Sequence, residues 1–397
     1  MTIRKYLPYL HPLFIAIAPA IFLWDKNFGE VRFTEVLPTV IILLVFGLCI
    51  VAVLHILFRN VQKSALAASV LLFIVLFFSY INTIFFSTII QLRWRWSFII
   101  LTLFFLLVLY LLKRTKKKLL PINQVLAVTT GIFVLLSMFQ VGNQYREQYY
   151  SIPAEQVAIS SNDSSDELRD IYYIILDGYS SPEVVREVLG YKEIDTFVSS
   201  LETEGFFVAS QSRSNYGATR LSLPSSLNMK YLESPESVKK HYLMLDDNQV
   251  KNFLKPYGYT YIHFGSDSFT FNNSYADINI NVGIFTPYQM ALWENTILSP
   301  LETILGGHGV IAENLGFLNR RQLQWERTHF KLDRLAEIAD EQENPVFIFA
   351  HFLVPQGSNS LDAQGNFPTQ EEVAKTRQNV LVDVAEVRST LVARMTQ

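Results

Sequence analysis

Five apolar stretches dominate the first 141 residues of this 397-residue chain and constrain its fold more than any other feature. A helix needs roughly 20 apolar residues to cross a bilayer, with about 17 as the lower limit. The second and third stretches clearly exceed this length, and the other three are close to the minimum. We therefore predict a membrane domain over 1–141 with about five transmembrane helices, and four as the alternative count. The stretches lie at 7–24, 36–58, 65–86, 96–112 and 125–141.

Basic residues in the short loops predict how these helices are oriented. The densest cluster, "KRTKKK" at 113–118, belongs in the cytoplasm, because cytoplasmic loops carry an excess of Lys and Arg. Recognition of lipid headgroups is a minor alternative role for this cluster. The prediction is a multi-pass protein of the cell membrane with a cytoplasmic N-terminus and an extracytoplasmic chain after residue 141. Successive loops lie on alternate sides of the membrane, so this assignment places nine Lys and Arg residues inside. Four lie outside, and these are Lys26, Arg32, Arg93 and Arg95.

Charge and cysteine content exclude several classes of function. The net charge is −3 and no basic stripe with interleaved aromatic residues is present, so we expect no nucleic-acid partner. The single cysteine, Cys49, lies in an apolar stretch, which excludes a disulfide within the chain and a cysteine-based metal site. No signal peptide stands apart from the first apolar stretch. Residues 142–170 are polar and Ser-rich, and we expect them to form a linker that can include a juxtamembrane helix.

From residue 171 onward, short apolar runs alternate with helical patterns. The run "IYYIIL" at 171–176 is typical of a strand buried on both faces, and Ser181-Pro182-Glu183 supplies the start of a helix. This alternation predicts an α/β fold with a mainly parallel sheet over 171–397. Further strands are expected at 206–209, at 259–264 and in the first half of 345–355, and further helices at 193–204, 246–258, 288–304 and 320–341.

Two polar residues follow predicted strands. Ligands of open α/β sheets bind beyond the carboxyl ends of the strands, which is where Asp177 and His351 fall. A carboxylate at Asp177 can ligate Zn²⁺, Mg²⁺ or Mn²⁺, and the alternative is that it caps the turn Asp177-Gly178-Tyr179-Ser180. His351 can bind substrate or metal, and the alternative is a histidine whose hydrogen bonds are satisfied at the end of its strand.

A third candidate is Thr219, which lies where a Ser/Asn/Gly loop runs into a helical pattern. A hydroxyl at a helix N-terminus lies among free backbone N–H groups and the positive end of the helix dipole, which suits a group that carries or binds phosphate. A nearby metal could lower the pKa of this hydroxyl and make it a nucleophile. The alternative is that Thr219 is an ordinary helix cap.

Four stretches together carry a family resemblance. They are "YYIILDGYSSPE" (172–183), "SNYGATRLSLPSSLNM" (214–229), "GYTYIHFGSDSFTFNNSYAD" (258–277) and "PVFIFAHFLVP" (345–355). Their order and spacing after a multi-span N-terminal half resemble the membrane-anchored, sulfatase-like branch of the alkaline phosphatase superfamily. That branch includes lipoteichoic acid synthases and phosphoethanolamine transferases. The resemblance covers roughly 171–360.

The resemblance implies a divalent metal (Zn, Mn or Mg) held by Asp177 and Thr219. Thr219 would also be the catalytic nucleophile, with Ser222 as the second choice, and Asn215 and His351 would contact substrate. A phosphoryl-linked group would transfer to the threonine and then to an acceptor hydroxyl or water. The expected substrate is a lipid or another component of the cell envelope. Sulfatase activity is not expected, because Ser226 stands where the sulfatase motif requires Arg.

The sequence departs from the family pattern in two places. "QGSNS" at 356–360 replaces the usual His-Pro-Pro segment, and no Ser-Asp-His-Gly-like motif follows His351. Gly307-His308-Gly309 precedes the last strand, so we interpret it as a turn, and we interpret the tail as an amphipathic helix. We therefore expect a family member cut short at its C-terminal end. The alternative function is a catalytically inactive membrane protein that keeps a binding or structural role.

Overall fold

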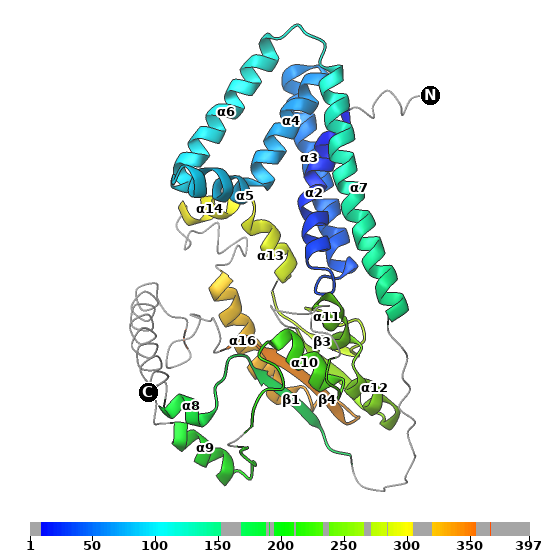
Figure 1. Cartoon of the computed structure of the whole chain (residues 1–397), viewed down its shortest axis with the longest axis vertical. Helices are drawn as coiled ribbons and strands as arrows, with labels where there is room; N and C mark the ends of the chain where they lie inside the picture. The colour runs from blue at the N-terminus through cyan, green and yellow to red at the C-terminus, as the bar shows by residue number, and fades with distance from the viewer. Residues whose placement is uncertain are drawn as a thin grey trace, which may run out of the picture. The chain divides into compact units, whose positions relative to one another are not determined.

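The structure is a computed structural model of the chain, which forms two compact units (Figure 1). The first unit holds the described residues of 1–159 and 283–318, and the second holds those of 160–282 and 319–397. The sequence placed the end of the membrane domain at 141 and assigned everything after 171 to the α/β domain. Residues around 285–304 instead pack with the first unit. The structure describes residues 9–151, 168–187, 190, 194–209, 212–232, 238–265, 271–283, 285–304, 320–354 and 366.

The first unit is a bundle of helices (Figure 1). Helix α2 packs against α3, α4 and α7, and α6 contacts α4 and the π-helix η2. Helix α7 continues past residue 141 to Ser151, so the first part of the predicted linker is helical. The helices of this unit are α2 (His11–Lys26), α3 (Phe33–Phe58), α4 (Val61–Leu76), α5 (Phe78–Ile81), η2 (Asn82–Ile89), α6 (Trp94–Arg114), α7 (Leu120–Ser151), α13 (Pro287–Glu294) and α14 (Leu298–Ile304).

Three helices in the described part of the chain are long and apolar enough to cross a membrane. They are Phe33–Phe58, Trp94–Arg114 and Leu120–Arg146. A fourth span results if the pair Val61–Leu76 and Phe78–Ile89, bent by 74°, is counted as one. Helix α2 has only 16 residues, which is below the length that a span needs. The upper count of four equals the alternative predicted from the sequence, and the described residues do not provide the five spans of the first prediction.

The bend between α4 and α5 coincides with a contact from a distant part of the chain. The Ile297 N–H donates to the Val75 carbonyl over 2.8 Å, and the Ser79 N–H donates to the Asn295 carbonyl over 3.1 Å. Backbone groups released by a broken helix need such partners wherever water is excluded. The Tyr288 hydroxyl donates to the Ala20 carbonyl over 2.9 Å and fixes α13 on α2. The sequence predicted a continuous helix at 65–86 because it gave no sign of this contact.

A buried polar network joins α2, α4 and α7. Both ring nitrogens of His11 are used, Nδ1 with Ser69 Oγ at 2.5 Å and Nε2 with Asn123 Oδ1 at 2.8 Å. The Asn123 amide nitrogen donates to the Leu119 carbonyl, so its oxygen is the atom that faces His11. The ring therefore donates from Nε2 and accepts the Ser69 proton at Nδ1. All three side chains are buried, and the network fixes the register of the three helices.

The second unit contains a four-stranded parallel sheet of order β1-β4-β2-β3. The predicted strands at 171–176 and 259–264 and the one in the first half of 345–355 are confirmed as β1 (Ile171–Leu176), β2 (Thr260–Phe264) and β4 (Val346–Phe352). The short strand β3 (Ile278–Ile280) was not predicted. The helices are α8 (Pro182–Glu187), α9 (Ile194–Thr203), α10 (Thr219–Leu227), α11 (Val238–Asp246), α12 (Gln249–Leu254), η3 (Lys255–Tyr257) and α16 (Arg320–Glu337).

Each face of the sheet has its own apolar core. On one face, Leu223 and Leu227 of α10 pack with Tyr261 of β2 and with Phe347 and Phe349 of β4. On the other face, alternate residues of β2 and β4 pack with Ile338 and Leu335 at the end of α16. Because successive side chains of a strand point to opposite faces, this division fixes which residues of β4 lie beside α10.

Two sequence predictions about strands are wrong. Residues 206–209 form no strand, and the side chains of Phe206 and Phe207 are exposed. Short apolar runs are ambiguous in sequence, and no sheet partner reaches this one in the described structure. Strand β1 is not buried on both faces, because it is the edge strand and Tyr172, Ile174 and Leu176 are exposed. The turn at 307–309, the segment 356–360 and the C-terminal amphipathic helix lie outside the described residues.

Candidate active site

The ends of β1 and β4 place Asp177 and His351 next to each other. The backbone N–H of Asp177 donates to the Phe352 carbonyl over 2.9 Å and extends the ladder between the two strands. Ile175 pairs with His351, and Asp177 follows Ile175 by two residues, so both polar side chains lie on the same face of the sheet. His351 Nε2 is 4.0 Å from Asp177 Oδ2. Gly178, with φ of 75°, then turns the chain away from the strand.

Helix α10 brings Thr219 to the same place. Leu223 and Leu227 hold the helix on the α10-facing core, and Thr219 is its first residue. The Thr219 hydroxyl donates a hydrogen bond to Asp177 Oδ1 over 3.0 Å. The first backbone N–H groups of a helix have no partners within the helix and carry the positive end of its dipole. The hydroxyl therefore lies between a carboxylate and a site that favours anions.

The imidazole of His351 is uncharged at neutral pH. Burial, together with the charge of the nearby Lys331 and with His263, lowers the pKa of this histidine to about 3. A neutral ring can donate one hydrogen bond and accept another, so His351 is suited to orient a group beside Asp177 rather than to supply charge.

Two residues of this region were not singled out in the sequence. His263 pairs with Phe349 across β2 and β4, so it lies on the same face as His351 and is also buried. Lys331 comes from α16 on the other face, and its ammonium donates to the carbonyls of Gly265 and His351 over 3.1 and 3.0 Å. A histidine inside the apolar run 259–264 was the available signal for His263, whereas no local pattern marks Lys331.

Asn215 and Ser222 contact each other instead of the Asp177 carboxylate. The Ser222 hydroxyl donates to Asn215 Oδ1, and the Asn215 amide nitrogen lies 3.4 Å from Ser226 Oγ. These bonds attach the loop before α10 to the helix. Asn215 remains exposed, so its predicted contact with substrate stays a prediction. Thr219, not Ser222, is the hydroxyl that reaches the end of β1, which favours Thr219 as the nucleophile.

The donors present fit a hydrated cation better than a zinc ion. Asp177 and Thr219 bring two oxygen atoms together, with a histidine nitrogen beside them. Among the described residues, no group of three or more His, Cys, Asp and Glu side chains could hold a metal. Zinc usually takes three or four protein ligands, whereas Mg²⁺ keeps several waters and is bound through one or two carboxylates and substrate phosphates. The pair therefore suits Mg²⁺ or the similar Mn²⁺.

Comparison of the chain with protein-family models, curated proteins and solved structures finds no match. We therefore infer a function from the geometry of Asp177, Thr219 and His351 and from the sequence resemblance.

Proposed function

We propose that the protein is a membrane-bound hydrolase or transferase that acts on phosphodiesters through Thr219. The observation that carries this proposal is the hydrogen bond from Thr219 to Asp177, made at a helix N-terminus and at the carboxyl end of a parallel sheet. A nucleophilic hydroxyl needs an adjacent group that takes its proton, and the carboxylate lies within that distance. The sequence resemblance to sulfatase-like phosphotransferases supports the same roles.

In the proposed reaction, Thr219 Oγ attacks the phosphorus atom while its proton passes to Asp177. A bond forms between Oγ and phosphorus, the bond from phosphorus to the leaving oxygen breaks, and the leaving oxygen takes up a proton. An acceptor hydroxyl or water then attacks the phosphothreonine and regenerates the free hydroxyl. The first N–H groups of α10 stabilise the negative charge on the phosphoryl oxygens. Neutral His351 orients the substrate or the carboxylate.

A divalent cation bound by Asp177 and Thr219 would supply polarisation of the phosphoryl group and a lower pKa for the hydroxyl. This cation is part of the proposal, with Mg²⁺ or Mn²⁺ favoured by the oxygen donors.

The location of the enzyme determines its class of substrate. The described part of the first unit contains three helices long and apolar enough to cross a membrane. We propose that the protein lies in the cell membrane with its N-terminus in the cytoplasm and its second unit outside, where lipid-linked or cell-envelope phosphodiesters are the substrates. The basic loop at 113–118 supports this orientation.

A second candidate function is a catalytically inactive membrane protein that retains a binding surface. The observation that favours it is the absence, among the described residues, of a third acidic or histidine metal ligand grouped with Asp177. Such a protein would hold a phosphorylated envelope component without cleaving it.

Turnover of a chromogenic phosphodiester distinguishes these two functions. The full chain in detergent would be assayed with bis(p-nitrophenyl) phosphate and Mg²⁺, Mn²⁺ or Zn²⁺. We expect hydrolysis that needs a divalent cation and disappears in Thr219→Val. Thr203→Val on α9 is the matched control, since its hydroxyl only bonds the Ser199 carbonyl within its own helix. Equal rates in wild type and Thr219→Val would refute the enzymatic proposal.

A further inference from the structure

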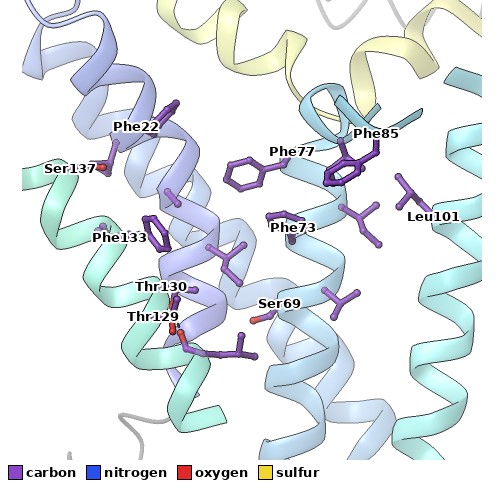
Figure 2. Close-up of a pocket in the computed structure, with 18 of the residues that line it drawn as sticks. Phe22, Ser69, Phe73, Phe77, Phe85, Leu101, Thr129, Thr130, Phe133 and Ser137 are labelled. Carbon is purple, nitrogen blue, oxygen red and sulfur yellow. Dashed lines mark hydrogen bonds between the residues drawn. The ribbon is translucent and has the colours of Figure 1, made fainter. Parts of the chain in front are cut away.

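The first unit contains an apolar groove among α2, α4, α6 and α7. Its volume is about 750 Å³, within the range of roughly 300–1,000 Å³ that small-molecule sites occupy. Figure 2 shows Phe73 and Phe133 reaching into it from α4 and α7, with Ser69 and Thr130 on the same two walls. The described residues that line the groove all belong to the first unit.

The lining is suited to hydrocarbon. Among the described residues that line the groove, none has a charged side chain. Its hydroxyls are in part engaged within the protein, since Ser69 bonds the His11 ring and Thr130 donates to the Leu126 carbonyl of its own helix. A ligand with buried polar groups would find few partners here and would lose its hydration. An alkyl chain has no hydrated polar groups, so it does not pay this cost of lost hydration on entry.

The groove is continuous with the surface that a membrane would cover. Phe22, Phe85 and Phe133 line it and are also exposed on the outside of the helices. Other exposed apolar residues surround them on α6 and α7, among them Leu103 and Leu136. A lipid tail could therefore enter sideways between helices without crossing water. Helices packed closely against one another would close such an opening. In the described part of the chain, α6 packs mainly against α4 and η2.

A positive charge lies beside the lining residue Phe22 at one end of the groove. The ammonium of Lys26 lies 5.3 Å from the centroid of the Phe22 ring, one helical turn beyond this lining residue. The Lys26 side chain is mostly exposed, although its nitrogen is 3.6 Å from Asp25. An exposed Lys at the end of an apolar groove is complementary to an anionic headgroup attached to a hydrocarbon chain.

We propose that this groove binds one hydrocarbon tail of an anionic membrane phospholipid, with the lipid phosphate beside Lys26. The inference rests on the membrane location proposed above, but it needs no chemistry at Thr219. A phospholipid held here would be either a resident lipid or a reservoir of substrate, and both share the same recognition.

Photo-cross-linking tests the tail site in the full chain. The protein would be placed in nanodiscs that contain phosphatidylglycerol with a diazirine in one tail, and labelled peptides would be mapped by mass spectrometry. We expect labels concentrated on groove residues such as Phe73 and Thr130. Labels spread evenly over these and outward residues such as Val125 and Val128 would overturn the proposal.

Tryptophan variants distinguish the effect of filling the groove from a general effect of the substitution on the fold. Thr130→Trp should lower groove labelling about tenfold, which corresponds to the lost burial of roughly two methylene groups. Ala18→Trp tests the same effect from α2, and Val128→Trp is the matched control on the exposed side of α7. Unchanged groove labelling in both filled variants would contradict the proposal.

Two further measurements address the headgroup and the catalytic proposal. Lys26→Gln should reduce the preference for labelled phosphatidylglycerol over labelled phosphatidylcholine, and an unchanged preference would refute the role of Lys26. Hydrolysis of the soluble bis(p-nitrophenyl) phosphate should be unaffected by Thr130→Trp. Normal labelling without any hydrolysis would reject the enzymatic function and support the lipid site. Hydrolysis without groove labelling would reject the lipid site and support the enzymatic function.

Discussion

Thr219 donates a hydrogen bond to Asp177 Oδ1 over 3.0 Å and so joins the start of α10 to the end of β1, 42 residues away in sequence. Neither residue has an obvious structural need for this contact, because Asp177 already extends the β1–β4 ladder through its backbone and α10 is held by Leu223 and Leu227. The bond places a hydroxyl, a carboxylate and a helix N-terminus together, and each prediction about activity begins from it.

Two replacements of Thr219 distinguish the contribution of its hydroxyl to turnover from that of its methyl group. Thr219→Val keeps the shape of the side chain but removes the nucleophile, and we expect phosphodiester turnover to fall by about 10³-fold or more. Thr219→Ser keeps an oxygen within reach of Asp177 and should retain measurable turnover. The rates of both variants with Mg²⁺ or Mn²⁺ check this, and a Val variant as active as the Ser variant would count against the nucleophile.

Asp177→Asn tests the carboxylate without changing its size. The amide cannot take the Thr219 proton and binds a cation weakly, so turnover should fall by roughly 10²–10⁴-fold. The thermal unfolding temperature should change little, because the Asp177 side chain is only partly buried and its backbone bond to Phe352 remains. If turnover is retained, Asp177 serves only to cap the turn before Gly178.

Stability should depend on pH through His351. The unfolded imidazole has a pKa near 6.5, and burial lowers the folded value to about 3. Between these values the unfolded chain binds more protons, so the free energy of unfolding decreases as the pH falls from about 6.5 toward 3. Thermal unfolding of the full chain in detergent at pH 7 and pH 5 measures this effect. The unfolding temperature of His351→Gln should differ less between pH 7 and pH 5 than that of wild type. Equal differences in the two proteins would exclude His351 as a source of the pH dependence.

Lys331→Met removes the cation that faces the ends of β2 and β4. The carbonyls of Gly265 and His351 lose their bonds to the ammonium, which should lower the free energy of unfolding by about 1–3 kcal/mol. Because the charge of Lys331 lowers the pKa of His351, the pH-dependent loss of stability should move to a narrower range in this variant. Denaturation at several pH values tests both effects. A pH profile identical to that of wild type would contradict the proposed coupling.

His11→Leu should destabilise the first unit. The substitution leaves Ser69 and Asn123 buried with a lost partner each, at a cost of about 1–3 kcal/mol per group. The thermal unfolding temperature in detergent should fall clearly relative to His55→Leu, a substitution in the last turn of α3 at a histidine outside this network. Equal effects of the two changes would show that the network contributes nothing.

Local sequence patterns were sufficient for the elements that carry the site. The continuous apolar runs at 171–176 and 345–355 gave two strands, and the rule that ligands bind at the carboxyl ends of strands placed Asp177 and His351 together. The start of α10 at Thr219 was expected from the loop before it. Its contact with Asp177 required tertiary packing, which in sequence was supported only by the family resemblance.

Long-range contacts account for what the sequence did not predict. The bend after Leu76 is accompanied by hydrogen bonds to Asn295 and Ile297, more than 200 residues away, and α13 rests on α2 through Tyr288. The strand expected at 206–209 failed because an apolar run becomes a strand only where a sheet edge accepts it. Lys331 reaches the site from α16, so no spacing along the chain could associate it with His351.

The most direct test of Thr219 as the nucleophile is the search for a covalent adduct on its side chain. The full chain in detergent, supplied with Mg²⁺ or Mn²⁺ and a phosphodiester, would be quenched in acid during turnover, and its peptides would be weighed by mass spectrometry. We expect a phosphoryl-linked group on Thr219 and none at this position in Thr219→Val. A preparation that hydrolyses the substrate while the adduct lies on another residue, or on none, would contradict this expectation.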